Sequence, residues 1–171
     1  GSDAVLKRMN RKYTRTDFIN FIERAAQTVP NLCIGTDVLV GFPGETDDDF
    51  ADTSSLIADH PVAYAHVFKY SDRKGAPAQR MGAKVAPAVA ARRSERVRAI
   101  SANNLDAFQR SFAGTTAEVL FEQQEKGLWT GYTMNYIRVA VCSSDQLSNT
   151  IRTVRLHAAE GDRMTGSLID D

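Results

Sequence analysis

The chain has 171 residues, of which 43% are hydrophobic and 25% charged, so it is expected to fold around one core or two small ones. Its 21 basic and 21 acidic residues cancel, so overall charge does not indicate nucleic-acid binding and any basic surface must be local. Cys33 and Cys142 form neither a CxxC pair nor a disulfide framework. No signal peptide or membrane span is recognisable, which makes the cytoplasm the expected compartment and excludes a membrane partner.

The first third of the chain predicts helix, strand and helix in succession. Gly1-Ser2 is interpreted as the remnant of a cleaved expression tag, so the natural chain is expected to begin upstream. Residues 4–15 are basic, which indicates either a solvated surface or a contact for phosphate or carboxylate. Thr14 with Asp17 is a candidate capping box for a helix that ends near Pro30. A buried strand follows over residues 32–40, of the kind that parallel sheets cover on both faces.

A glycine-rich turn follows this strand. Gly41 and Gly44 permit backbone angles that other residues avoid, and Thr46 with Asp49 predicts the start of a helix over residues 47–58. Such turns lie at the carboxyl ends of strands, where open α/β sheets and (β/α) barrels bind ligands. Asp37 places an acid inside the apolar strand. An ordinary turn with an acid at the end of a strand is the equally weighted alternative.

A second buried strand is predicted over residues 62–70, and a polar loop follows it on the same side as the glycine turn. His66 within this strand is interpreted as a core residue, not a metal ligand. A long helix is predicted over residues 87–112. Its Arg92, Arg93, Arg96 and Arg98 form either a solvated face, an RNA contact or a surface for a missing domain.

From Thr115 the pattern changes to five short strands, over residues 117–121, 128–133, 136–141, 150–156 and 164–169. Strands of this length and spacing predict a small closed barrel of the OB type, with a domain boundary near residues 112–115. The side chains of Trp129, Tyr132, Tyr136 and Arg138 either bind nucleobases or form barrel core, and the pattern gives both interpretations equal weight.

Several of these segments together resemble a known family. Residues 9–15 (MNRKYTR), 36–50 (TDVLVGFPGETDDDF) and 68–78 (FKYSDRKGAPA) are similar to the carboxyl half of radical-SAM tRNA methylthiotransferases. Residues 119–122 and 131–139 resemble their TRAM domain. The resemblance implies an α/β fold: residues 3–112 as the carboxyl-terminal part of a radical-SAM partial (β/α) barrel with a linking helix, and 113–171 as an RNA-binding, OB-like TRAM barrel. The nearest branch is the MtaB type, which acts on threonylcarbamoyladenosine at position 37 of tRNA.

The resemblance also implies cofactors and site residues. The family uses S-adenosylmethionine (SAM) and two 4Fe–4S clusters to insert a methylthio group, and its partner is the anticodon stem-loop of tRNA. Asp37 and the turn would line the SAM nucleoside, the strand ending at Phe68 and Tyr70 would flank its adenine, and Ser71 and Arg73 would face the mouth of the active site. The residues implied for the turn are Gly41, Phe42, Gly44 and Glu45. RNA contacts are expected at Arg92, Arg93 and Arg96 and at the four barrel residues named above.

The chain departs from the family in lacking its cluster-binding cysteines, because neither Cys33 nor Cys142 matches them. We therefore expect a piece of a longer enzyme that is inactive alone, holds no cofactor tightly, lacks the amino-terminal cluster domain and self-associates through its half-barrel. The alternatives are the sister activity on isopentenyladenosine, a stand-alone RNA-binding module without catalysis, and a degenerate scaffold.

Overall fold

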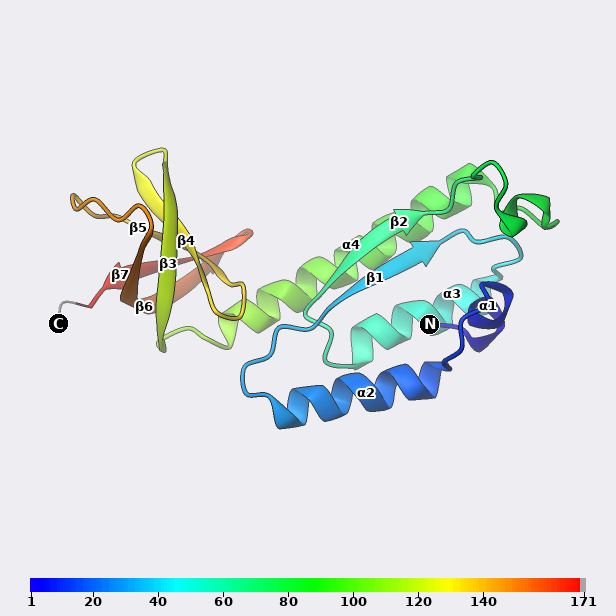
Figure 1. Ribbon diagram of the computed structural model, residues 1–171, viewed down its shortest axis with the longest axis horizontal. Helices are drawn as coiled ribbons and strands as arrows, with labels where there is room; N and C mark the ends of the chain where they lie inside the picture. Colours follow the sequence, from blue (N-terminus) through cyan, green and yellow to red (C-terminus); the bar gives the residue numbers. More distant parts are fainter. Residues whose placement is uncertain (170–171) are drawn as a thin grey trace. The chain divides into compact units, whose positions relative to one another are not determined.

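The computed structural model describes residues 1–169, and the chain divides into two compact units at Asn104 and Leu105 (Figure 1). Asp170 and Asp171, the end of the predicted second domain, lie outside the described residues. The first unit contains α1 (Asp3–Arg8), α2 (Arg15–Thr28), β1 (Gly35–Val40), α3 (Asp47–Asp59), β2 (Tyr64–Lys69), the 3₁₀ helix η1 (Pro77–Arg80) and most of α4 (Pro87–Arg110). Within the described residues no helix is both long and apolar enough to cross a bilayer.

In the first unit, β1 and β2 form a parallel two-stranded sheet, and α3 connects them. The register pairs Val38 with Val67, so both side chains lie on the same face. Helices α2, α3 and α4 cover this face and contribute Ile22, Ile57 and Val97 to its core. The helix, strand, helix, strand order predicted from the sequence is therefore confirmed.

The opposite face of the same sheet is exposed, whereas the sequence predicted strands buried on both faces. Asp37 and His66 are Cα partners on this face, and both are exposed. Phe68, two residues beyond His66, keeps 54% of its surface exposed. His66 is thus not a core residue, because the strands alternate between a packed face and an open one.

The starts of α2 and α3 confirm both predicted capping boxes. The Thr46 hydroxyl accepts a hydrogen bond from the Asp49 N–H at 3.1 Å, and the Asp49 carboxylate accepts from the Thr46 N–H at 3.0 Å. Thr14 and Asp17 make the same reciprocal pair at the start of α2. These caps satisfy N–H groups that have no partner inside the helix.

Helix α1 was not predicted, and Ser2 has a structural role in it. The Ser2 hydroxyl accepts from the Val5 N–H as the cap of α1 and donates to the Asp49 carboxylate, and Ser2 keeps only 2% of its surface exposed.

The second unit is a closed barrel of β3 (Thr116–Glu125), β4 (Leu128–Thr133), β5 (Arg138–Val141), β6 (Thr150–Glu160) and β7 (Arg163–Leu168), in the order β3-β4-β5-β7-β6. The predicted five-stranded closed barrel is confirmed. Strands β3 and β6 extend four residues beyond their predicted ends, because pairing resumes after an irregularity in each strand, at residues 123–125 and 159–160. Strand β5 begins two residues late, after Tyr136 at a φ of 61°. The barrel core contains Phe121, Val139 and Leu156.

Candidate functional site

The glycine turn between β1 and α3 has a defined backbone geometry. Gly41 and Gly44 take φ values of 77° and 80°, in the left-handed region that side chains disfavour. A Cβ on Gly41 would lie 2.8 Å from the Cβ of Ala90 on α4. The Gly44 N–H donates to the Ala83 carbonyl at 2.8 Å, which ties the turn to the segment before α4. The turn is thus held in place by two contacts, one with α4 and one with the segment before it.

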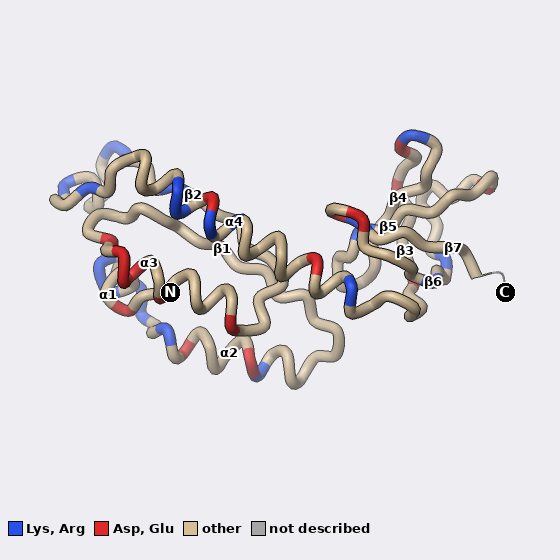
Figure 2. The backbone as a smooth tube through the Cα atoms, turned by 180° about the vertical axis from the view of Figure 1, so that it is seen from behind, with Lys and Arg blue, Asp and Glu red and all other residues tan. Residues whose placement is uncertain are grey.

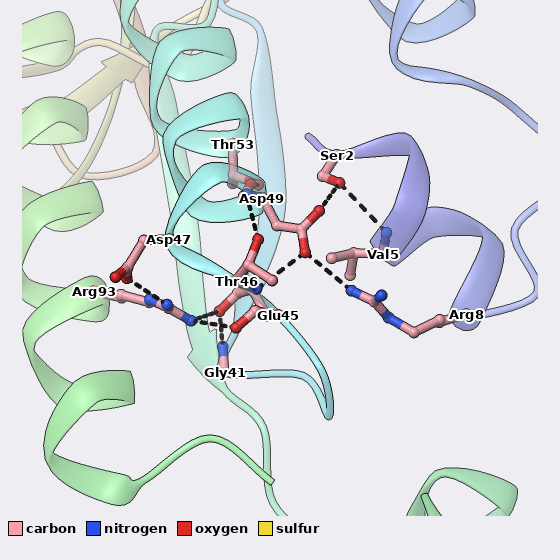
Figure 3. A network of polar contacts seen from close by, with 10 residues as sticks. All are labelled: Ser2, Val5, Arg8, Gly41, Glu45, Thr46, Asp47, Asp49, Thr53 and Arg93. Carbon is pink, nitrogen blue, oxygen red and sulfur yellow. Dashed lines mark hydrogen bonds and ion pairs between the residues drawn. The ribbon is translucent and has the colours of Figure 1, made fainter. Parts of the chain in front are cut away.

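A buried ion pair supports this turn from within (Figure 3). The Glu45 carboxylate accepts from the Gly41 N–H and from Nη1 of Arg93, both at 2.7 Å. The side chains of Glu45 and Arg93 keep 2% and 7% of their surfaces exposed. Nη2 of Arg93 also donates to Asp47 at 2.7 Å. Glu45, predicted to line the cofactor, therefore closes the turn, and its carboxylate is already engaged inside the protein.

A second ion pair lies on the other side of the turn (Figure 3). Nη2 of Arg8 donates to the Asp49 carboxylate at 3.1 Å, and a Cβ on Gly44 would lie 3.5 Å from the Arg8 guanidinium. Burial raises the pKa of Asp49, but hydrogen bonds from Ser2, Thr46 and Arg8 outweigh this effect and hold the pKa at about 2. Sequence reasoning missed this pair, because nothing local links residues 8 and 49.

An open pocket lies beside the turn, where β1 and β2 end. Its volume is about 500 Å³, and Leu39, Lys69 and Ala76 line it together with five of the predicted cofactor residues. Those five residues are Phe42, Phe68, Tyr70, Ser71 and Arg73. The rings of Phe42 and Tyr70 meet edge to face at 5.4 Å between centroids. The fold thus gathers residues from the turn, from β2 and from the loop after it.

A second cavity, of about 210 Å³, lies between β1 and the amino-terminal segment. Asp37, Glu45 and Phe68 line it together with Arg11 and Tyr13 from the basic run near the start of the chain. Phe68 also lines the open pocket, so the two spaces adjoin along the open face of the sheet. Asp37 is therefore available to a ligand, with a cation and apolar walls nearby.

The predicted RNA-binding arginines of α4 separate into two kinds. Arg92 and Arg96 are exposed, as predicted for a surface contact. Arg93 is buried and bound to Glu45 and Asp47, so the structure gives it a structural role and removes it from that surface. Arg98 donates to the Val67 carbonyl at 2.5 Å and likewise serves the fold.

The four predicted RNA-binding residues of the barrel also differ in exposure and pairing. Trp129 is a core residue with 5% of its surface exposed, so it is not free to stack on a base. Tyr132 and Tyr136 are exposed by 39% and 79%. Arg138 lies beside Tyr132 in the sheet, but its guanidinium is paired with Glu125 and Asp162 at 2.8 Å each. The two tyrosines are therefore the barrel residues available for stacking.

The residues present do not fit a 4Fe–4S cluster. Such a cluster needs several thiolates, whereas Cys33 and Cys142 are the chain's two cysteines and belong to different units. Within residues 1–169 no group of three or more His, Cys, Asp or Glu side chains lies close enough to hold a metal ion. The residues do fit an adenosyl ligand in part, because Asp37 and the exposed ring of Phe68 offer a hydroxyl acceptor and an apolar surface.

Comparison with known families shows what the first third of the chain is similar to. The model of the Radical SAM superfamily matches residues 1–57, which include α1, α2, β1 and most of α3. This match covers the glycine turn and the strand that carries Asp37.

Individual relatives are similar along most or all of the chain. A tRNA-2-methylthio-N(6)-dimethylallyladenosine synthase of Lachnoclostridium phytofermentans is 34% identical over the whole of this chain and 38% of its own length. The threonylcarbamoyladenosine tRNA methylthiotransferase MtaB of Bacillus subtilis is 34% identical over 91% of this chain and 36% of its own length. These matches confirm the resemblance to radical-SAM tRNA methylthiotransferases. The chain spans somewhat more than a third of the length of these relatives.

Proposed function

We propose that this chain is part of an enzyme that adds a methylthio group to an adenosine of tRNA by radical-SAM chemistry. The observation that carries the proposal is similarity along the whole chain to enzymes named for that reaction, together with a family match over the strand and turn of the candidate site. When bound, SAM and the clusters would supply the radical and the methylthio group. The cluster ligands would have to come from outside these residues, so the chain alone is proposed to be inactive.

The open face of the sheet is the proposed cofactor side. Asp37 would accept hydrogen bonds from ribose hydroxyls, and Phe68 would pack on the adenine. The Gly41–Glu45 turn would bring backbone close to the ligand, with Glu45 holding the turn closed. Ser71 and Arg73 would lie at the entrance, where the open pocket meets solvent.

The barrel is the proposed tRNA-binding unit, in the role of a TRAM domain. Exposed tyrosines on a small closed barrel are typical of proteins that stack unpaired bases. Tyr132 and Tyr136 fit that role, whereas Trp129 is buried in the barrel and Arg138 forms an ion pair within it. Binding of the anticodon stem-loop should depend on salt, because phosphate contacts release counterions.

For the substrate we propose threonylcarbamoyladenosine at position 37, with isopentenyladenosine as the alternative. One relative named for each substrate matches this chain at 34% identity, so the identities do not favour either substrate. The choice of the first follows the resemblance to the MtaB type. The test is nucleoside mass spectrometry of bulk tRNA from a strain that lacks the gene. Loss of the methylthio group from threonylcarbamoyladenosine would support the proposal, and loss from isopentenyladenosine would support the alternative. No loss from either would overturn methylthiolation and favour an RNA-binding module without catalysis.

A further inference from the structure

The connection between β2 and α4 concentrates positive charge. Residues 69–84, here called the basic loop, contain one acid, Asp72, and five basic residues: Lys69, Arg73, Lys74, Arg80 and Lys84. The remaining residues of the unit 1–104 contain ten basic and eleven acidic side chains, so the excess charge of this unit lies in the loop. Figure 2 shows the blue positions recurring along this connection. Although the chain has no net charge, its basic residues are therefore concentrated in this loop.

The loop neutralises its own acid and leaves the other cations free. Nζ of Lys84 donates to Asp72 at 2.6 Å and to the Ala78 carbonyl at 3.0 Å, and the Tyr70 hydroxyl donates to Asp72 at 2.7 Å. These bonds fold the loop back on itself. Among the described residues, the other four cationic side chains of the loop make no hydrogen bond or ion pair, and all four residues are exposed: Lys69, Arg73, Lys74 and Arg80.

The arginines of α4 do not offer a comparable surface. Arg93 is buried, and Arg96 lines a hollow shared with Asp47 and Asp59. Glu95 is exposed next to Arg96 in the sequence. Acidic neighbours weaken the attraction of a surface for phosphate. The basic loop is thus a better anion surface than the helix that sequence reasoning had selected.

Aromatic surface lies next to these cations. Lys69 and Arg73 line the open pocket together with Phe68, Tyr70 and Phe42. Phe68 is 54% exposed and directly precedes Lys69. A groove that combines free cations with exposed aromatic rings suits single-stranded nucleic acid, whose phosphates pair with the cations while a base stacks on a ring. A free phosphate would not need the rings.

We propose that the basic loop binds the sugar-phosphate backbone of a single-stranded segment of the RNA substrate. A base of that segment would stack on Phe68 from the open pocket, whereas the adenine of the cofactor would contact Phe68 from the smaller cavity that Asp37 lines. The proposal rests on the proposed function for its choice of RNA. It adds an RNA contact in the first unit, distinct from the barrel. Lys74 and Arg80, which do not line the pocket, serve as pure phosphate contacts, whereas Arg73 also borders the pocket.

The test is fluorescence anisotropy of a labelled anticodon stem-loop RNA titrated with the chain at several salt concentrations. The variant K74A/R80A removes two free cations, and K7A/R24A removes one exposed lysine and one exposed arginine elsewhere in the unit. We expect the loop variant to bind about tenfold more weakly at low salt and its salt slope to fall by about 1.4, which is about 0.7 for each single-strand phosphate contact. The control should lose much less of both.

A second measurement tests the stacked base. A 2-aminopurine in the RNA loop should be quenched on binding to the unaltered chain, and Phe68→Ala should reduce the quenching. Equal weakening by K74A/R80A and K7A/R24A would overturn the basic loop as a specific contact. If loss of Tyr132 and Tyr136 still abolished binding in that case, the proposed tRNA function would stand without this inference. Absence of any RNA binding by the unaltered chain would overturn both, and equal competition by polyglutamate would overturn RNA as the occupant.

Discussion

Arg93 and Glu45 lie 48 residues apart in the sequence, and Nη1 of Arg93 donates a 2.7 Å hydrogen bond to Oε2 of Glu45 in the interior of the first unit. The same carboxylate accepts from the Gly41 N–H. One ion pair therefore joins α4 to the turn at the end of β1. Because the candidate site is built on that turn, its shape depends on a residue from a distant helix.

Arg93→Ala should lower the free energy of unfolding by about 3–5 kcal/mol, because it leaves the Glu45 carboxylate buried without its partner. Urea denaturation followed by circular dichroism measures this change. Arg92→Ala is the matched control, since Arg92 is an exposed neighbour on the same helix and its loss should cost less than about 0.5 kcal/mol. Equal effects of the two variants would contradict the buried pair.

Gly41→Ala should destabilise the protein more than Gly75→Ala. Both glycines have positive φ, of 77° and 84°, so each substitution costs about 1–2 kcal/mol in backbone strain. A Cβ on Gly41 also meets Ala90, whereas one on Gly75 meets nothing within 4 Å. The difference between the two variants in thermal denaturation therefore measures the contact. Ala90→Gly should cost less in the Gly41→Ala background than in the unaltered chain, because it relieves the contact in the first case and only weakens α4 in the second. Equal costs in the two backgrounds would show that the contact is unimportant.

Asp49 should make stability depend on acidity. Its folded-state pKa of about 2 lies below the ordinary value of 3.8, so its contribution is fully present above pH 3.8 and is lost as the pH falls through about 2. Asp49→Asn should reduce stability at pH 7 and flatten its dependence on pH between about 4 and 2. Denaturant midpoints at a series of pH values measure both effects. Asp48→Asn, at an exposed position of the same helix turn, is the control and should retain the original slope.

Substitutions of Trp129 and Tyr136 should have different effects, the first on the stability of the barrel and the second on RNA binding. Trp129→Ala opens a cavity in the barrel core and should cost about 3–5 kcal/mol. Tyr136→Ala should leave stability nearly unchanged but weaken RNA binding by the loss of one stacked base, about 1–3 kcal/mol. Calorimetry and anisotropy measure the two quantities. Unchanged RNA affinity in Tyr136→Ala would remove this tyrosine from the proposed interface.

Local patterns in the sequence were enough to predict most of the elements, although not α1 or η1. Both capping boxes were predictable because their hydrogen bonds join residues three positions apart. The five barrel strands were recognisable from their spacing, although the ends of β3 and β6 were not, since only pairing with a neighbouring strand keeps those ends extended. The glycine turn was also predictable, because Gly41 and Gly44 take the positive φ values that favour glycine.

Only the tertiary structure decided which side chains face inward. Arg92 and Arg93 are equivalent by composition, yet one is solvated and the other is buried, because a helix turns adjacent residues to different sides and packing selects the buried one. Trp129 and Tyr132 differ likewise, since closure of the barrel encloses one face of β4. The pocket beside the turn has the same origin: its walls come from residues 39–42 and 68–76, which become neighbours only when β1 and β2 pair in parallel.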